Sequence, residues 1–446
     1  MARFLFGTDG VRGVAGEFLT AELSLALARA ATQRVDAARP RVLVIRDTRE
    51  SGEMLEAAIA AGVAAAGGEA LLGGVLPTPG APLLIERYGF DLGVVLSASH
   101  NPYRDNGVKF FGGDGFKLSD AAELEIERAL EPVANGNGAG QVGRVRTLEG
   151  ALEDYLRALH ERFELLDLSG LRIALDCANG ATHRAAPEIF RRLGADVDVL
   201  ADAPDGRNIN AGCGSTHVDT LAAHVRAGGH DAGFAFDGDG DRVLAVDRHG
   251  VVVDGDELIA LAALHLRSAG RLPGGGVAVT VMTNYGFHTA MRAAGVEVAT
   301  TPVGDRYVLE ALREREWALG GEQSGHIIDT GFVPSGDGIA AALLTLESLE
   351  DGDLAGRHAM EKLPQRLVNV RFADRAALTG AVEATAADVE AESAALSGRG
   401  RVLVRPSGTE PLVRVMVEAP TAEEADAVSG RLAASVEAAR GAGSRS

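Results

Sequence analysis

Cysteine and aromatic residues are scarce in this chain of 446 residues, and basic residues are fewer than acidic ones. The two cysteines, Cys177 and Cys213, are too few for a disulfide framework and lack Cys-x-x-Cys spacing. Such sparse cysteine use is typical of a reducing compartment, so we expect a cytoplasmic protein. The net charge is -20 and the pI is near 5.0, which disfavours nucleic acid and anionic membranes as partners.

Long hydrophobic runs and a leader-like start are also missing. The longest run of small apolar residues, 57–66, is about half as long as a membrane span and fits a packed helix. Residues 1–7 lack the charged and apolar regions of a signal peptide, so we expect a soluble protein without a membrane partner. Apolar residues still make up 46% of the chain, and its length predicts roughly two to four domains.

A pattern of apolar strand, polar or glycine-rich turn and helix occurs three times in the chain. Each copy predicts one α/β unit with a mostly parallel sheet and right-handed crossovers. The tail differs, because its alternating strands and helices predict a small two-layer α+β unit. The repeated strands are expected at 41–46, 171–176 and 277–281, a first helix at 20–38, and tail helices at 376–396 and 421–439.

We therefore predict an α/β fold with three similar α/β domains and a smaller C-terminal α+β domain around a central cleft. The sheets of the three similar domains should be mixed but mostly parallel. The domain limits are expected at 1–165, 166–255, 256–364 and 365–446. Residues 134–143, rich in glycine and asparagine, are predicted to form a surface loop near the first limit.

The chain is organised around residues 97–102, Ser-Ala-Ser-His-Asn-Pro, which directly follow an apolar strand. Because Pro102 disfavours helical backbone at Asn101, these residues should form an irregular loop at the carboxyl end of that strand. Ligands bind at this edge in open α/β sheets. Two interpretations stand at this point: a displayed nucleophilic hydroxyl, or a turn capped by its own serine and asparagine side chains.

Three carboxylates alternate with glycine after another apolar strand, at Asp237, Asp239 and Asp241. Hard oxygen ligands at this density suit Mg²⁺ or Ca²⁺ rather than zinc. An EF-hand loop is excluded, because it needs glycine and glutamate where Arg242 and Arg248 stand. Three uncompensated carboxylates would repel one another strongly, which favours a cation site over a simple acidic turn.

Two further loops carry groups that bind sugars and phosphates. Residues 320–326, Gly-Gly-Glu-Gln-Ser-Gly-His, offer a carboxylate, an amide, a hydroxyl and an imidazole for polyol hydroxyls. Residues 405–411, Arg-Pro-Ser-Gly-Thr-Glu-Pro, offer a guanidinium, two hydroxyls and backbone N–H groups for a phosphate dianion, and Arg414 lies close beyond them. A polar turn and a plain hairpin loop are the alternatives for these two stretches.

In this order, the motifs resemble those of the α-D-phosphohexomutase superfamily over essentially the whole chain. They include residues 7–13, Gly-Thr-Asp-Gly-Val-Arg-Gly, together with the serine, aspartate, glutamate and arginine loops described above. Residues 105–111 and 303–308, with Gln323, are most similar to the bacterial phosphoglucosamine mutase branch of that superfamily. The resemblance implies four domains around a central cleft, in agreement with the prediction from the repeats.

The resemblance also implies the composition of the active site. Ser99 would carry a phosphoryl group and share one Mg²⁺ per chain with Asp237, Asp239 and Asp241. The other implied site residues are Arg12, Lys109 and Arg242 facing the phosphoserine, Glu322, Ser324, Asp305 and Arg306 on the sugar, and Arg405, Ser407, Gly408, Thr409 and Arg414 on the phosphate that does not react.

By the same resemblance, the expected partner is a small phosphosugar. Glucosamine 6-phosphate would become glucosamine 1-phosphate through a glucosamine 1,6-bisphosphate intermediate, which reorients between the two phosphoryl transfers. The reaction would feed UDP-N-acetylglucosamine and cell-wall precursor synthesis. Lys109, His100 and His326 are the candidate general acids and bases, with Lys109 ranked first. The sequence does not set the oligomeric state, and a homodimer stands among the alternatives.

Three other functions are weighed against this one. A phosphomannomutase or phosphoglucomutase shares every catalytic part and differs in how the second position of the sugar is recognised. A sugar-phosphate sensor would keep only the binding loops, whereas here Ser99, Lys109 and the three aspartates are all present. A phosphatase would use the same phosphoserine, since mutases avoid hydrolysis by excluding water on domain closure.

Overall fold

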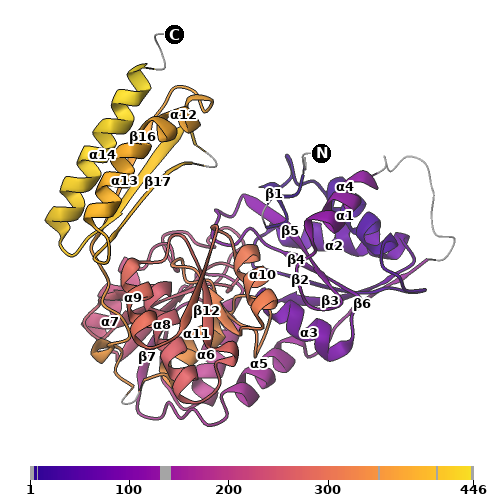
Figure 1. Cartoon of the computed structure of the whole chain (residues 1–446). Helices are drawn as coiled ribbons and strands as arrows, with labels where there is room; N and C mark the ends of the chain where they lie inside the picture. Colours follow the sequence, from indigo (N-terminus) through magenta and orange to yellow (C-terminus); the bar gives the residue numbers. More distant parts are fainter. Residues whose placement is uncertain (1–4, 8, 131–141, 350–351, 408–409, 443–446) are drawn as a thin grey trace. The chain divides into compact units, whose positions relative to one another are not determined.

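The computed structural model describes residues 5–7, 9–130, 142–349, 352–407 and 410–442. Figure 1 shows the course of the chain through its helices and strands. The chain divides into two compact units, which are described separately below. The first unit comprises Met1–Met282 and Val296–Arg357, and the second comprises Thr283–Gly295 and His358–Ser446.

The first sheet of the first unit has six strands. Strands β4, β2, β3 and β6 pair in parallel, and β5 runs antiparallel to both of its neighbours, β1 and β4. β6 was missed by the sequence analysis, which expected only a loop before residue 144; residues 131–141 of that loop lie outside the described residues. Across the sheet, the strands are β1 (Val11–Val14), β5 (Asp105–Gly112), β4 (Leu92–Leu96), β2 (Arg41–Arg46), β3 (Glu69–Val75) and β6 (Arg144–Thr147).

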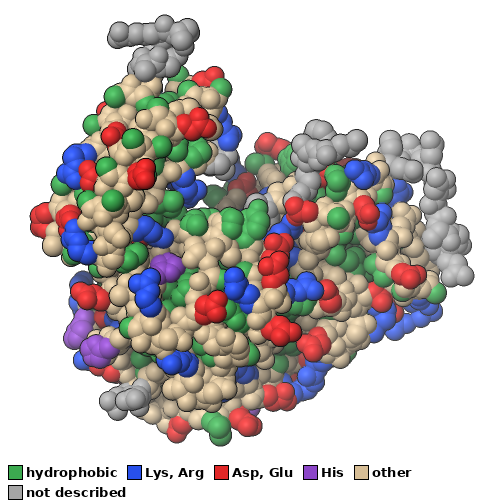
Figure 2. Space-filling view, in the orientation of Figure 1, with side chains coloured by type: hydrophobic (Ala, Val, Ile, Leu, Met, Phe, Trp, Pro, Cys, Tyr) green, Lys and Arg blue, Asp and Glu red, His purple; other side chains and the backbone are tan. Residues whose placement is uncertain are grey.

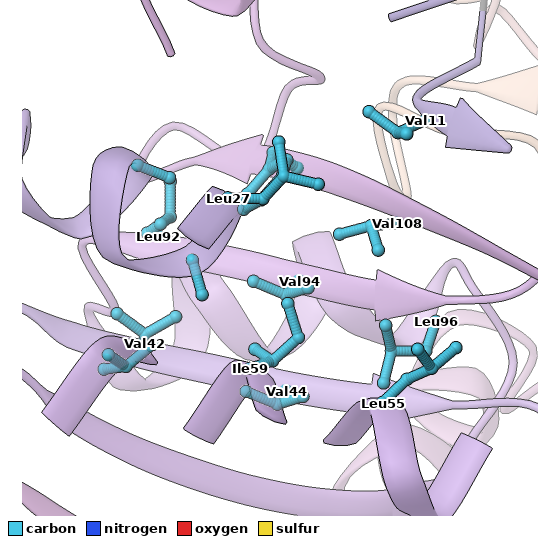
Figure 3. Close-up of a cluster of buried hydrophobic side chains, with 14 of the residues drawn as sticks. Val11, Leu27, Val42, Val44, Leu55, Ile59, Leu92, Val94, Leu96 and Val108 are labelled. Atoms are coloured by element: carbon cyan, nitrogen blue, oxygen red, sulfur yellow. The ribbon is translucent and has the colours of Figure 1, made fainter. Parts of the chain in front are cut away.

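Branched aliphatic side chains fill the space between this sheet and its helices. Figure 3 shows Val42, Val44 and Val94 from the strands facing Leu55 and Ile59 from a helix, and all five are fully buried. β-branched residues suit a strand that is covered on both faces, and their burial stabilises the sheet. The helices of this region are α1 (Ala21–Gln33), α2 (Ser51–Ala65), α3 (Gly80–Tyr88), α4 (Asp120–Arg128) and α5 (Ala151–Arg162).

The first helix is shorter than predicted. It begins after Thr20, whose hydroxyl accepts a hydrogen bond from the backbone N–H of Leu23, but it ends at Gln33 instead of near residue 38. Turns and bends occupy residues 34–39. The end is marked by the backbone N–H groups of Arg34 and Val35, which donate to the carbonyl oxygens of Ala31 and Thr32, three residues back instead of four. Pro40 sets only the outer limit, because it disfavours helical backbone at the residue before it.

The first unit contains two further mixed sheets with helices between their strands. The second sheet has the order β11 (Val252–Val253), β10 (Val243–Asp247), β9 (Ala232–Phe236), β7 (Arg172–Asp176) and β8 (Asp196–Leu200), with α6 (Thr182–Arg192) and α7 (Asp219–Gly228). The third has the order β13 (Glu297–Thr301), β12 (Gly276–Thr280), β14 (Leu319–Gly321) and β15 (Ile327–Asp329), with α8 (Gly255–Ser268), α10 (Asp305–Arg315) and α11 (Gly338–Glu347).

The second unit contains α9 (Tyr285–Ala293) and a three-stranded antiparallel sheet, β16 (Gln365–Arg371), β18 (Leu412–Glu418) and β17 (Arg401–Pro406). Helix α14 (Ala422–Ala442) packs against β16 and β18. The single helix predicted at 376–396 is wrong, because Thr385 separates α12 (Ala377–Ala384) from α13 (Ala386–Ala395). The Thr385 hydroxyl donates to the carbonyl oxygen of Ala381 at 3.2 Å, a contact that bends helices.

The predicted fold class is confirmed: three mixed, mostly parallel α/β sheets precede a small α+β region. The limits proposed at residues 165, 255 and 364 stay predictions. In the described part of the chain, no helix is long and apolar enough to cross a membrane. Figure 2 shows acidic and basic side chains intermingled over the face in view, so the negative net charge is not gathered in one patch there.

A buried carboxyl group makes the stability of the first unit depend on pH. Asp337 caps α11 by accepting from the backbone N–H of Ala340 at 2.9 Å, and it also accepts from the Tyr155 hydroxyl at 2.9 Å. Burial raises the pKa of Asp337 to about 6. The folded protein therefore binds this proton more tightly than the unfolded chain, so stability falls as pH rises from about 4 through 6.

We expect the D337N variant to be more stable than the wild type above pH 6. Asparagine keeps the cap and removes a charge that costs on the order of 3 kcal/mol when ionised in the folded protein. Thermal unfolding midpoints at pH 8 and pH 5 check this, with a gain that is largest at pH 8. D254N, at the half-buried cap of α8, is the control and should show no such trend. An equal shift of D337N at both pH values would contradict the assignment.

Candidate active site

Ser99 lies three residues beyond the end of β4, in the irregular loop that the sequence predicts. Its side chain is almost completely buried, and its backbone has a φ of 53°, in the left-handed region that a non-glycine residue adopts only under constraint. The Ser99 Oγ donates to Asp237 Oδ2 at 2.5 Å and lies 3.3 Å from His100 Nδ1. The loop therefore holds one hydroxyl directly against the acidic loop of the next sheet.

A buried arginine holds this loop in its strained conformation. Arg49 is fully buried after β2, where its Nε donates to Asp47 Oδ2 at 2.8 Å. Its terminal nitrogens donate to the carbonyl oxygens of Ser99 and Asn101, both at 2.9 Å, and to that of Pro102. Three carbonyl groups are thereby fixed by one planar guanidinium, which explains how the φ of Ser99 is maintained.

Three further hydrogen bonds complete this support. The Ser97 hydroxyl donates to Asp47 Oδ2 at 2.6 Å and accepts from the backbone N–H of Ser99 at 2.9 Å. From the second sheet region, Asn210 Nδ2 donates to the Ser99 carbonyl oxygen at 2.9 Å. Ser97 is thus a positioning residue, and Ser99 is the one whose hydroxyl faces the carboxylates.

The three aspartates converge at the carboxyl end of β9. Asp237, Asp239 and Asp241 are at most 4% exposed, and their nearest carboxylate oxygens lie within 4.8 Å of one another. Among the described residues, Asp239 Oδ1 and Asp241 Oδ1 are buried and accept no hydrogen bond. Buried, unsatisfied oxygens are costly unless a cation binds them, so these residues fit a hard divalent ion with oxygen ligands.

The protonation of the cluster reflects the same crowding. Burial and the charges of Asp241 and Asp239 hold the pKa of Asp237 well above its ordinary value. Burial would also raise the pKa of Asp241, but Lys109 and His326 outweigh it and bring that pKa well below its ordinary value. The mutual repulsion of the three carboxylates therefore raises the pKa of Asp237, the residue that contacts Ser99.

Gly238 allows the acidic loop to approach the serine loop. A Cβ atom at this position would lie 2.6 Å from the Ser99 carbonyl oxygen and 2.7 Å from Asn210 Nδ2. Both contacts are closer than van der Waals packing permits, so a larger residue would push the two loops apart. The glycine between the first two aspartates is therefore required by packing as well as by backbone freedom.

Lys109 on β5 compensates much of this negative charge. Its Nζ is almost completely buried and lies 2.9 Å from Asp239 Oδ2, 3.1 Å from Asp9 Oδ2 and 3.6 Å from Asp241 Oδ2. Burial lowers the pKa of Lys109, but these three carboxylates more than reverse the effect and raise it. The sequence analysis expected Lys109 to face the phosphoserine; in the structure Lys109 contacts the same acidic cluster that Ser99 contacts.

A chain of alternating charges continues from Lys109 to His326. Asp9 Oδ1 and Asp305 Oδ2 each lie 2.5 Å from Lys117 Nζ. His326 closes the ring, with Nε2 3.7 Å from Asp305 Oδ2 and Nδ1 3.6 Å from Asp241 Oδ1. Asp305 and His326, both predicted as site residues, therefore border the acidic cluster from the third sheet.

Two arginines border the serine loop. Arg242 Nη1 lies 3.2 Å from His100 Nδ1, and the Arg242 backbone N–H donates to Asp237 Oδ1 at 3.2 Å. Arg12 on β1 forms an ion pair with Asp9. Burial together with Arg242 and Arg12 lowers the pKa of His100, so its imidazole is neutral at pH 7. An anion bound here would meet two guanidinium groups.

The predicted sugar loop follows β14. Glu322 Oε1 accepts from the backbone N–H of Gly304 at 3.0 Å, while the Ser324 side chain is exposed. Arg306, which the sequence analysis assigned to the sugar, forms ion pairs with Asp120 and Glu123 of α4. Glu322 and Ser324 thus lie at a loop that a sugar could reach, and Arg306 joins that region to the first sheet's helix α4.

The predicted phosphate loop belongs to the second unit and is described within it. Arg405 on β17 pairs in register with Arg414 on β18, so their side chains share one face of the sheet. Burial and Arg414 lower the pKa of Arg405. The Ser407 hydroxyl accepts from the Glu410 backbone N–H at 3.2 Å. Gly408 and Thr409, two further predicted residues, lie outside the described residues.

Several supporting residues were missed from the sequence. Asp47 and Arg49 could have been found only from their position: they directly follow strand β2, just as the serine loop directly follows strand β4. Thr78, whose hydroxyl donates to Asp239 Oδ2 at 2.8 Å, carried no motif. Asp9 and Lys117 gave no sign of their mutual ion pair, since 108 residues separate them.

Comparison with known proteins gives four matches in chain order. The family models for phosphoglucomutase/phosphomannomutase match the chain with alpha/beta/alpha domain I at residues 3–136, domain II at 153–250, domain III at 254–367 and the C-terminal domain at 367–435. Phosphoglucosamine mutases of Parafrankia sp. (strain EAN1pec) and Mycolicibacterium vanbaalenii are each 51% identical to the chain. They cover 97% and 99% of it, and 98% and 100% of their own lengths.

Solved structures share the fold at lower identity. A phosphoglucomutase/phosphomannomutase family protein from Burkholderia thailandensis has a TM-score of 0.80 at 23% identity, with 97% of each chain covered. The N-acetylphosphoglucosamine mutase of Aspergillus fumigatus, in complex with GlcNAc-6P and magnesium, has a TM-score of 0.66 at 20% identity. That comparison covers 98% of this chain and 96% of the other.

The acidic cluster predicts a measurable response to divalent cations. After chelation, adding back a divalent cation should raise the thermal unfolding midpoint of the wild type, because binding to the folded state adds stability. The D239N variant should lose most of this rise, since one ligand and one charge are removed. Differential scanning calorimetry checks this, with D388N at an exposed helix position as the control. An undiminished rise in D239N would show that the cation binds elsewhere.

Proposed function

Because the chain belongs to the phosphoglucosamine mutase branch of the phosphoglucomutase/phosphomannomutase family, we propose that it interconverts glucosamine 6-phosphate and glucosamine 1-phosphate. The observation that carries the proposal is the buried Ser99 hydroxyl, held 2.5 Å from Asp237 in a cluster of three carboxylates. Such a constellation suits phosphoryl transfer, in which positioning and charge neutralisation supply most of the catalysis. The product would feed the synthesis of UDP-N-acetylglucosamine and cell-wall precursors.

Ser99 is the proposed phosphoryl carrier. It donates its phosphoryl group to the sugar monophosphate and recovers one from the other end of the resulting glucosamine 1,6-bisphosphate. Arg49, through the loop carbonyls, keeps the serine aligned in both transfers, and a displacement of about 1 Å would already slow them strongly.

The three aspartates are the proposed ligands of one Mg²⁺, together with the phosphorylated Ser99. When bound, this ion neutralises charge on the phosphoryl oxygens. Lys109 forms ion pairs with Asp239 and Asp241 and so holds both carboxylates in place. Arg12 and Arg242 supply guanidinium groups beside the serine loop, where the phosphoryl oxygens would lie.

The candidate general acids and bases are ranked by their position in the site. Lys109 is first, because its Nζ reaches the cluster directly, and His100 is second, with Nδ1 3.3 Å from Ser99 Oγ. His326 is the third candidate, since it contacts Asp241 and Asp305.

The remaining predicted residues are proposed to hold the substrate. Glu322 and Ser324 bind sugar hydroxyls, with Asp305 and Arg306 beside them on α10. In the second unit, the loop after β17 binds the phosphate that does not react. Its proposed ligands are Arg405, Ser407, Gly408, Thr409 and Arg414. A cytoplasmic location and a homodimer stay predictions.

A second candidate activity differs only in the sugar. Phosphoglucomutases and phosphomannomutases share the family models that match this chain. The segment at 303–308 and Gln323 favour the amino sugar. Gln323 Nε2 donates to Asp254 Oδ2 at 3.2 Å, so it also fixes the conformation of the sugar loop. A sensor is less well supported, because serine, lysine and all three carboxylates form one connected site. A phosphatase would share these groups, so the assay below separates it from a mutase.

Substrate selectivity tests the proposed activity. Coupled assays should give a higher kcat/KM for glucosamine 6-phosphate than for glucose or mannose 6-phosphate, by about tenfold or more if one polar contact reads the amino group. The S99A variant should be inactive on all three, which controls for contaminating enzymes. Equal or higher efficiency on glucose or mannose phosphates would reject the amino-sugar assignment. Faster release of inorganic phosphate than isomerisation would instead indicate a phosphatase.

A further inference from the structure

A second cluster of metal-ligating side chains lies in the second sheet region, apart from the acidic cluster. Asp198 is on the edge strand β8, His224 is on α7, and His230 follows the C-terminal end of that helix. Their nearest ligand atoms all lie within 4.8 Å of one another. His230 precedes β9 and Asp237 follows it, so the two clusters lie at opposite ends of a strand of five residues, or about 17 Å.

The distances within this cluster match a shared ion. Asp198 Oδ2 lies 2.8 Å from His224 Nε2 and 3.3 Å from His230 Nε2. A tetrahedral ion with nitrogen and oxygen ligands at about 2.0–2.2 Å sets its ligands about 3.3 Å apart. The Asp198–His230 distance equals this separation, the Asp198–His224 distance is about 0.5 Å shorter, and all three ligand atoms lie within 4.8 Å of one another.

The second observation is that His230 is buried without a hydrogen-bond partner. Its side chain is 2% exposed, and neither Nδ1 nor Nε2 makes a hydrogen bond within the described part of the chain. The Nε2 is close to Asp198, but the two are not aligned for an N–H···O bond. A buried imidazole in this state is costly, whereas a ring nitrogen directed at an ion beside the carboxylate would be satisfied.

The backbone and the exposure of the site also favour a bound cation. A Cβ atom on Gly228 would lie 2.4 Å from His230 Cε1, so glycine leaves the room that the ring occupies. His224 and Asp198 are partly exposed, so solvent could supply a fourth ligand.

We propose that Asp198, His224 and His230 bind one divalent ion of the zinc class, distinct from the ion of the acidic cluster. Two imidazole nitrogens and one carboxylate suit zinc, whereas Mg²⁺ prefers oxygen ligands alone. Bound there, the ion joins the edge strand β8 to the end of α7. The site does not depend on the proposed function, because none of its residues belongs to the active site.

Zinc binding to the full-length chain without a histidine tag tests this proposal. Titration with Zn²⁺ in millimolar Mg²⁺, which fills the acidic cluster, should reveal one tight site per chain. D198N and H224Q, both at partly exposed positions, should weaken it by at least about tenfold. H160Q, at an exposed histidine of α5, is the matched control and should leave the affinity unchanged. Circular dichroism verifies that each variant is folded.

Three results would overturn the proposal. The wild type could bind Zn²⁺ no more tightly than D198N. A tight site could survive in both D198N and H224Q, which would place it elsewhere. D239N could abolish the site while D198N keeps it, which would place the zinc ion in the acidic cluster. Substitution by Co²⁺ adds a spectroscopic check, because its visible absorption should change in H224Q and stay constant in H160Q.

Discussion

The burial of three carboxylates against one serine hydroxyl is the constraint on which the rest of the site depends. Asp237, Asp239 and Asp241 cannot share a dry space as free anions, so the fold surrounds them with cations. Lys109 contacts two of them directly, and a ring through Asp9, Lys117, Asp305 and His326 fixes that lysine in turn. The remaining unsatisfied oxygens, on Asp239 and Asp241, are where a divalent cation fits. Charge compensation by protein and ion together makes the cluster stable and also suits it to a phosphoryl group.

The repeated architecture explains how residues from distant parts of the chain meet. The serine loop follows β4, the acidic loop follows β9, and the loop with Glu322 follows β14, each at the carboxyl end of a strand with a parallel neighbour. Backbone hydrogen bonds hold two of these loops: the N–H of Thr78, after β3, donates to the carbonyl oxygen of Asp239, and the N–H of Val243, at the start of β10, donates to that of Gly325. Glycines at 238 and 325 permit these approaches, since a Cβ on either would overlap a neighbouring carbonyl oxygen. The sheets thus act as rigid supports, and function resides in their connecting loops.

Much of this could be predicted from residue patterns, and the failures have physical causes. Strands at 41–46 and 171–176 were found because continuous apolar runs mark buried strands, and Ser99 and the three aspartates were found because their motifs directly follow strands of this kind. Helix α1 was extended past Gln33 because its composition stays favourable until Pro40 intervenes. Contacts between residues far apart in the sequence could not be predicted from local patterns. Arg49 lies in a stretch typical of a turn, yet its side chain binds three carbonyl groups about 50 residues away. Ion pairs such as Lys117 with Asp305 depend on tertiary packing, which one sequence does not reveal.

The most direct test of the account is a single turnover of enzyme labelled on Ser99. The wild type would be phosphorylated with ³²P-labelled glucosamine 1,6-bisphosphate, freed of sugar and mixed with one equivalent of unlabelled glucosamine 6-phosphate. The account predicts that label leaves the Ser99 peptide at least as fast as kcat and appears in sugar phosphate, and that S99A takes up no label. Label that stays on the protein while the sugar isomerises, or equal labelling of S99A, would contradict it.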